Sequence, residues 1–106
     1  MTEFRYIARF KEYTDGVCSV YFPDLECATE GHDKDHAKLL AADLLEIWLE
    51  IFIEEGRRLP IPRSRKELEA DTSLYQHIDE EDYEESTTDF IEITVRLPVT
   101  SKDSSG

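Results

Sequence analysis

Residues 33–56 read DKDHAKLLAADLLEIWLEIFIEEG, and this stretch decides the fold because no glycine or proline interrupts it before its last residue. Asp33 suits the N-cap position, and Gly56 suits the position after the last helical turn. Pro60 and Pro62 prevent the helix from resuming. The pattern predicts a helix over residues 34–55, roughly 33 Å long at 1.5 Å per residue.

The apolar residues of this helix predict which side meets the core. They recur at helical spacing at Ala37, Leu40, Ala41, Leu44, Trp48, Ile51 and Phe52. Trp48 is therefore interpreted as a core residue. Further apolar residues at Leu45, Ile47, Leu49 and Ile53 widen the arc beyond what one sheet face would cover. Either a second chain packs there in a homodimer, or the C-terminal segment covers the flanks.

The other strong patterns are strands. Residues 4–11 and 17–22 alternate around a turn that contains Asp15 and Gly16, which predicts a β-hairpin ended by Pro23. A short third strand is expected at 27–30, closed by Gly31. Residues 90–97 alternate and are rich in β-branched side chains, so they form the last strand, which Pro98 stops.

The element order predicts an α+β fold, β-β-β-α-β, in which an antiparallel sheet carries one long helix packed on one face. Residues 1–64 form the core, and 65–89 form an acidic insert with a short helix at 64–71 capped by Ser64. Residues 90–98 complete the same domain with the last strand, and 99–106 form a polar, disordered tail.

Composition limits the classes of function. The chain has 106 residues, enough for one domain, and a net charge of −13, which repels the phosphate backbone of nucleic acids. No apolar run is long enough to cross a membrane, and the N-terminus lacks the pattern of a secretory signal. Two cysteines do not form a disulfide framework. We expect a cytoplasmic protein with reduced thiols.

The acidity is concentrated in one segment. Residues 67–92 contain eleven acidic residues and no lysine or arginine. The densest part comprises Asp79, Glu80, Glu81, Asp82, Glu84 and Glu85. Runs of like charge often serve as interaction arms, but apolar residues such as Leu74 and Tyr75 also lie in this segment. It therefore either contains a short helix that docks lightly or becomes ordered only on a partner. The preceding basic cluster, Arg57, Arg58, Arg63, Arg65 and Lys66, is interpreted as pairing with this segment, within the chain or across a dimer, in preference to a nucleic-acid patch.

Several short motifs, in order and at matching spacing, resemble the HicB family of antitoxins over residues 4–64. They are Asp15-Gly16, Phe22-Pro23-Asp24-Leu25, Cys27-Ala28-Thr29-Glu30-Gly31, Glu54-Glu55-Gly56 and Pro60-Ile61-Pro62. The resemblance implies a fold similar to a partial ribonuclease H, without its catalysis. It also implies structural roles for Asp15, Gly16, Phe22, Pro23, Asp24, Gly31, Gly56 and Pro60.

The resemblance implies a partner as well, because such antitoxins neutralise HicA, a small basic ribonuclease. Two surfaces are candidates for that contact. One is the sheet edge together with the acidic stripe of the helix at Asp43, Glu46 and Glu50, and the other is the acidic segment between residues 79 and 85. The alternative is a stand-alone oligomeric scaffold or small-ligand binder of the same fold. No helix-turn-helix or ribbon-helix-helix pattern follows Leu97, so we expect no direct DNA binding.

A few residues are candidates for catalytic or metal-binding chemistry. A Mg²⁺-dependent nuclease would need carboxylates such as Asp15, Asp24 and Glu92 to converge. His32 and His36 lie one helical turn apart but lack a third zinc ligand at a fixed spacing. Cys27 is interpreted as a packed thiol, not as a nucleophile. We therefore expect neither enzymatic activity nor a cofactor.

Overall fold

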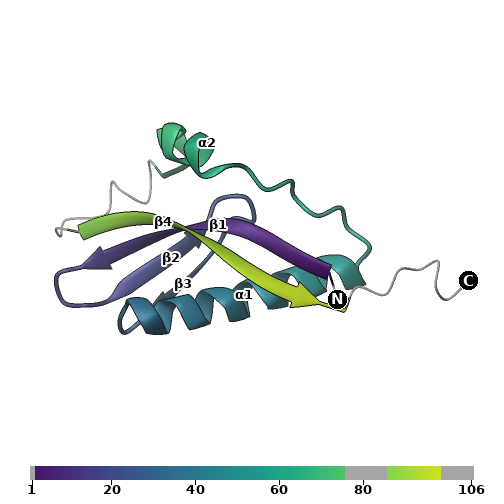
Figure 1. The fold of residues 1–106 in the computed structure, drawn as a ribbon, viewed down its shortest axis with the longest axis horizontal. Helices are drawn as coiled ribbons and strands as arrows, with labels where there is room; N and C mark the ends of the chain where they lie inside the picture. Colours follow the sequence, from purple (N-terminus) through teal and green to yellow (C-terminus); the bar gives the residue numbers. More distant parts are fainter. Residues whose placement is uncertain (1, 76–85, 99–106) are drawn as a thin grey trace, which may run out of the picture.

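The computed structural model describes residues 2–75 and 86–98. Its elements are β1 (Thr2–Tyr13), β2 (Cys18–Phe22), β3 (Cys27–Gly31), α1 (Lys34–Glu54), α2 (Arg65–Ala70), the 3₁₀ helix η1 (Thr72–Tyr75) and β4 (Ser86–Leu97). The four strands form one antiparallel sheet in the order β3-β2-β1-β4, and α1 lies across one face (Figure 1). The predicted α+β class, with its antiparallel sheet and one long helix, is confirmed. No helix of the described residues is both long and apolar enough to span a membrane.

The two longest strands extend beyond the predicted ranges 4–11 and 90–97. β1 and β4 pair along their whole length, from Thr2 opposite Leu97 to Tyr13 opposite Ser86. This ladder brings polar residues 86–89 into the sheet, although their sequence has no strand pattern of its own. The predicted start at residue 90 was therefore wrong, because a non-local pairing partner sets where β4 begins.

Both ends of α1 are closed by local hydrogen bonds. The Asp33 side chain accepts the backbone N–H of His36 at 2.8 Å, which confirms the predicted N-cap. At the other end Gly56 has φ 67°, and the N–H groups of Gly56 and Arg57 donate to the carbonyls of Ile53 and Phe52. This is a Schellman motif, which requires a residue that tolerates positive φ.

The buried side of α1 differs from the predicted face. Its buried residues are Ala37, Ala41, Leu45, Leu49 and Phe52. Leu45 and Leu49 are fully buried, whereas Ile51 is 38% exposed. The prediction placed the face too far toward Leu40, Leu44 and Ile51, because the apolar residues cover so much of the helix that periodicity alone does not fix its rotation. Trp48 is half-buried and packs against the core, as predicted.

Gly31 explains how closely β3 approaches α1. A Cβ atom at this position would lie 2.5 Å from the backbone nitrogen of Ala37 and 2.7 Å from its Cα. Both atoms belong to the backbone of the first helical turn, so neither moves without shifting the helix. The glycine lets the helix begin directly against the end of the strand.

The segment after α1 crosses to the opposite face of the sheet, where α2 and η1 lie (Figure 1). Leu68 of α2 and Tyr75 of η1 are buried there. The Tyr75 hydroxyl donates to the Leu68 carbonyl at 3.0 Å, and the Arg9 guanidinium stacks 4.2 Å above the centre of the Tyr75 ring. The Tyr75 ring also packs edge-on against Tyr21 and Phe90. The first part of the acidic insert is thus a second packed layer.

Candidate functional site

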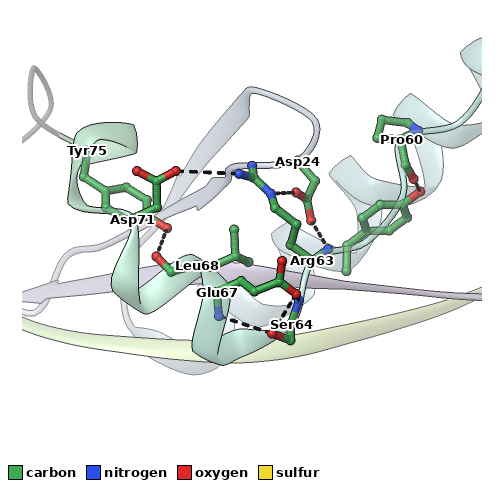
Figure 2. A network of polar contacts seen from close by, with 9 residues as sticks. Asp24, Pro60, Arg63, Ser64, Glu67, Leu68, Asp71 and Tyr75 are labelled. Atoms are coloured by element: carbon green, nitrogen blue, oxygen red, sulfur yellow. Dashed lines mark hydrogen bonds and ion pairs between the residues drawn. The ribbon is translucent and has the colours of Figure 1, made fainter.

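One polar network fastens the segment that crosses between the two faces (Figure 2). Arg63 donates its Nε to Asp24 Oδ1 at 2.6 Å and its backbone N–H to Asp24 Oδ2 at 3.0 Å. The Tyr6 hydroxyl donates to the Pro60 carbonyl at 2.6 Å. We call residues 57–64 the strap, because these contacts tie it to the β2–β3 turn and to β1. Asp24 and Pro60, both singled out from the motifs, lie in this network.

The strap leads into α2 through a capping box. The Ser64 side chain accepts the Glu67 backbone N–H, and the Glu67 carboxylate accepts the Ser64 backbone N–H at 3.2 Å. The Ser64 cap was predicted, but the reciprocal contact of Glu67 was not. Serine followed three residues later by glutamate is a recognised signal for a helix start, so this feature was available in the sequence.

The basic cluster is largely paired within the chain. Arg63 binds Asp24 and lies 3.9 Å from Asp71, and Arg65 binds Glu69 at 2.7 Å. Arg57 lies 3.3 Å from Glu55 and stacks over the Phe52 ring. The acidic partners include residues of the insert, as predicted, and also Asp24 and Glu55. Arg63 thus ties the strap to the β2–β3 turn, whereas Arg57 and Arg65 make these contacts with near neighbours in the chain.

The turn residues from the motifs have local structural contacts. Asp15 Oδ1 accepts the Val17 backbone N–H at 3.0 Å, and Gly16 has φ 97°, so both residues shape the β1–β2 turn. Phe22 and Pro23 are buried at the β2–β3 turn. In that turn Glu26 has φ 54°, a left-handed conformation that is uncommon for residues with a side chain.

The residues considered for catalysis and metal binding have local structural surroundings. Burial raises the pKa of the Cys27 thiol to about 11, which keeps it protonated and a poor nucleophile near neutral pH. His36 uses its Nδ1 to accept the His32 backbone N–H at 3.0 Å. Within residues 2–75 and 86–98, no group of three or more His, Cys, Asp or Glu side chains is arranged to hold a metal ion.

The carboxylates considered for a nuclease lie on different elements of the fold. Asp15 is in the β1–β2 turn, and Asp24 is bound to Arg63 at the other end of β2. Glu92 lies in β4, opposite Ile7 of β1. These side chains do not form the convergent set that two-metal chemistry needs.

The outward side of α1 combines acidic and apolar side chains. Asp43, Glu46 and Glu50 are exposed on it. Leu39 and Ile47 are 68% and 54% exposed, and Ile51 lies at its margin. We call these residues the outer face of α1. The other predicted contact residues, Asp79, Glu80, Glu81, Asp82, Glu84 and Glu85, lie outside the described residues.

A groove of about 900 Å³ lies on the opposite face of the sheet, between the strap and strands β1 and β4. Its lining includes the basic residues Arg5, Arg63 and Arg65, the acidic residues Glu3, Glu67 and Glu92, and the apolar residues Ile7 and Phe90. Because both signs of charge are present in similar number, the groove has no single-sign field that would select a charged ligand.

No family model matches the chain, and no curated protein matches it. One solved structure with a similar chain is described as a toxin-antitoxin complex from Streptococcus pneumoniae. The TM-score is 0.74 and the sequence identity is 23%, over 90% of this chain and 70% of that chain. At this identity the likeness establishes a shared fold.

Proposed function

We propose that this protein is a HicB-like antitoxin that binds and neutralises a small basic ribonuclease of the HicA type. The observation that carries the proposal is the outer face of α1, where exposed acidic and apolar side chains alternate along one helix. Such a surface suits a basic protein partner, because apolar contacts supply binding energy and the acidic side chains supply orientation.

The overall charge supports the same partner class. A net charge of −13 accelerates the encounter with a positively charged protein and opposes contact with nucleic acid. A ribonuclease that binds RNA needs a basic surface, and an acidic protein that covers this surface blocks substrate access. Neutralisation by occlusion requires no catalytic group in the antitoxin, so we propose a binding role and no enzymatic activity.

Two independent lines of evidence favour the toxin-antitoxin assignment over a general binding role. The short motifs between Asp15 and Pro62 resemble the HicB family in sequence. Separately, the fold is similar to a chain of a toxin-antitoxin complex. The motif residue Asp24 also has a physical reason to be aspartate, since it accepts two hydrogen bonds from Arg63.

The test is to mix the purified chain with the small basic ribonuclease encoded beside it. We expect a stable complex in size-exclusion chromatography with mass detection, and loss of RNA cleavage at equimolar antitoxin. Exposed ion pairs are screened by salt, so the dissociation constant should rise with ionic strength. Absence of both binding and inhibition at low salt would refute the proposal.

The groove beside the strap favours a second candidate, a small-ligand-binding domain of the same fold without a toxin partner. Its volume of about 900 Å³ is in the range of ligand sites. A ligand that raises the melting temperature of the chain, and loses this effect when Arg5 is replaced by Ala, would support this candidate. Its binding would leave the ribonuclease unaffected.

A further inference from the structure

β4 is an outer strand of the sheet. It pairs with β1 on one side, and no strand of the described residues pairs with its other side. Residues 91–97 read IEITVRL, with neither proline nor lysine, two residues that commonly protect such edges. The opposite edge, β3, has only 5 residues. The long edge of β4 is therefore the place where another strand can join the sheet.

The two faces of this half of β4 differ in chemistry. Ile93, Val95 and Leu97 point toward α1 and are buried. Glu92, Thr94 and Arg96 point to the opposite face and are exposed. α2 and η1 contact the beginning of β4, through Arg65 near Asp89 and Tyr75 against Phe90. The layer on this face thus meets β4 before residue 91.

We propose that the occupant of this edge is a second copy of the chain, paired antiparallel along residues 91–97 with the two-fold axis at Thr94. This register places Glu92 opposite Arg96 of the second copy, and symmetry repeats the pair on the other side of the axis. On the α1 side it places Ile93 opposite Val95 of the second copy. The product is a continuous eight-stranded sheet, made from two copies of the four-stranded one.

Charge pairing distinguishes this register from the neighbouring registers of the two β4 strands. Moving the axis to Ile93 would place Glu92 opposite Thr94, and moving it to Val95 would place Glu92 opposite Pro98. A shift by one residue would oppose side chains from different faces, which the pleat forbids. Only the axis at Thr94 places each charged residue of 91–97, Glu92 and Arg96, across from a residue of opposite charge. Cross-strand pairs of this kind stabilise antiparallel sheets.

The same charges favour a second copy over a basic partner. Residues 91–97 contain one acidic and one basic side chain, so this edge lacks the negative charge that a basic protein would select. Arg96 already lies 3.3 Å from Glu3 of β1 and is highly exposed. A guanidinium group has five N–H donors, so Arg96 can bind Glu3 and Glu92 of a second copy together.

The test uses sedimentation of the full chain alone, so it does not depend on the proposed toxin partner. We expect a concentration-dependent dimer. Thr94→Asp would place two carboxylates across the axis and should raise the dimer dissociation constant about tenfold or more. Thr88→Asp is the matched control, because Thr88 and Thr94 lie on the same face of β4. Each also has a basic residue of β1 as its cross-strand neighbour, Lys11 for Thr88 and Arg5 for Thr94. Thr88→Asp should leave the dissociation constant unchanged.

A charge exchange tests the register itself. Glu92→Arg and Arg96→Glu should each weaken the dimer, and the double variant should recover most of the lost affinity. Matching far-ultraviolet circular dichroism would show that the variants fold. A monomer at concentrations up to about 1 mM would overturn the proposal. So would a dimer that ignores Thr94→Asp, one equally weakened by Thr88→Asp, or one that the charge exchange fails to restore.

Discussion

Asp24 and Arg63 are joined by two hydrogen bonds, one from the side-chain Nε and one from the backbone N–H of Arg63. The Asp24 side chain is only 3% exposed. The contact links the β2–β3 turn to the strap and so fixes where α2 lies on the sheet. A short-range motif in the sequence thereby positions a layer that begins some forty residues later in the chain.

Replacing Asp24 tests this link. Asp24→Ala should lower the free energy of unfolding by about 2–3 kcal/mol, because charge-assisted hydrogen bonds are lost and a part-buried backbone N–H is left without its acceptor. Asp24→Asn keeps an acceptor and should cost less. Urea unfolding measures both, and a double-mutant cycle with Arg63→Ala should show coupling between the side chains. Additive effects would contradict the link.

Ionisation of Tyr75 should lower the free energy of unfolding at alkaline pH. Burial raises its pKa to about 12, above the ordinary value near 10. The folded state therefore favours the protonated phenol. The stability that this preference contributes is complete below pH 10 and is lost as the pH rises toward 12. The loss should be about 1–2 kcal/mol.

Tyr75→Phe isolates this effect. Near neutral pH the variant loses the hydrogen bond to the Leu68 carbonyl and should be less stable by about 1 kcal/mol. Urea unfolding of both proteins between about pH 8 and 12 should show the difference shrinking or reversing, since phenylalanine does not ionise. Tyr6 and Tyr21 also have raised pKa values through burial, but they are common to both proteins. A constant difference would contradict the assignment.

Glu26 offers a stabilising substitution. Its φ of 54° is costly for a residue with a Cβ and easy for glycine. Glu26→Gly should raise the free energy of unfolding by about 0.5–1 kcal/mol, after the larger backbone entropy of glycine in the unfolded chain is included. Glu30→Gly is the control, because Glu30 lies in the extended strand β3 and should lose stability. Thermal unfolding that ranks the two variants the other way would contradict this interpretation.

Gly31 should tolerate no side chain. Gly31→Ala places a Cβ against the backbone of Ala37 and should lower the free energy of unfolding by about 2–3 kcal/mol. The exposed neighbour Glu30 supplies the control, since Glu30→Ala should stay within about 0.5 kcal/mol of the parent. Equal effects in chemical denaturation would show that the close approach of β3 to α1 is unimportant.

Local signals in the sequence predicted the elements and the fold class. Asp33, Gly56 and the turn at Asp15 and Gly16 act through their own neighbours, so their roles follow from short-range chemistry. Features that depend on residues far apart in the sequence could not be predicted in this way. The start of β4 at Ser86 depends on pairing with Tyr13, and the rotation of α1 depends on which leucines meet the sheet.

The short helix of the second layer was predicted, but the way this layer packs on the sheet was left open. Leu68 and Tyr75 sit in a segment whose acidic composition favours a solvated arm. They are buried because Arg9, Tyr21 and Phe90, from three different strands, form a site for the Tyr75 ring. No window of the sequence contains these residues together. The exposed stripe at Asp43, Glu46 and Glu50, by contrast, could be predicted from helical spacing alone.

The proposed function is tested most directly by the affinity for the neighbouring basic ribonuclease after charge reversal at Glu50 on the outer face of α1. Glu50→Lys should raise the dissociation constant about tenfold at low salt, with RNA cleavage restored in proportion. Glu30→Lys makes the same charge change at an exposed residue of β3, outside the outer face of α1, and should have a much smaller effect. In calorimetry, we expect the parent to bind the ribonuclease tightly and only Glu50→Lys to weaken the complex. Equal affinities for all three proteins, or no binding by the parent, would contradict it.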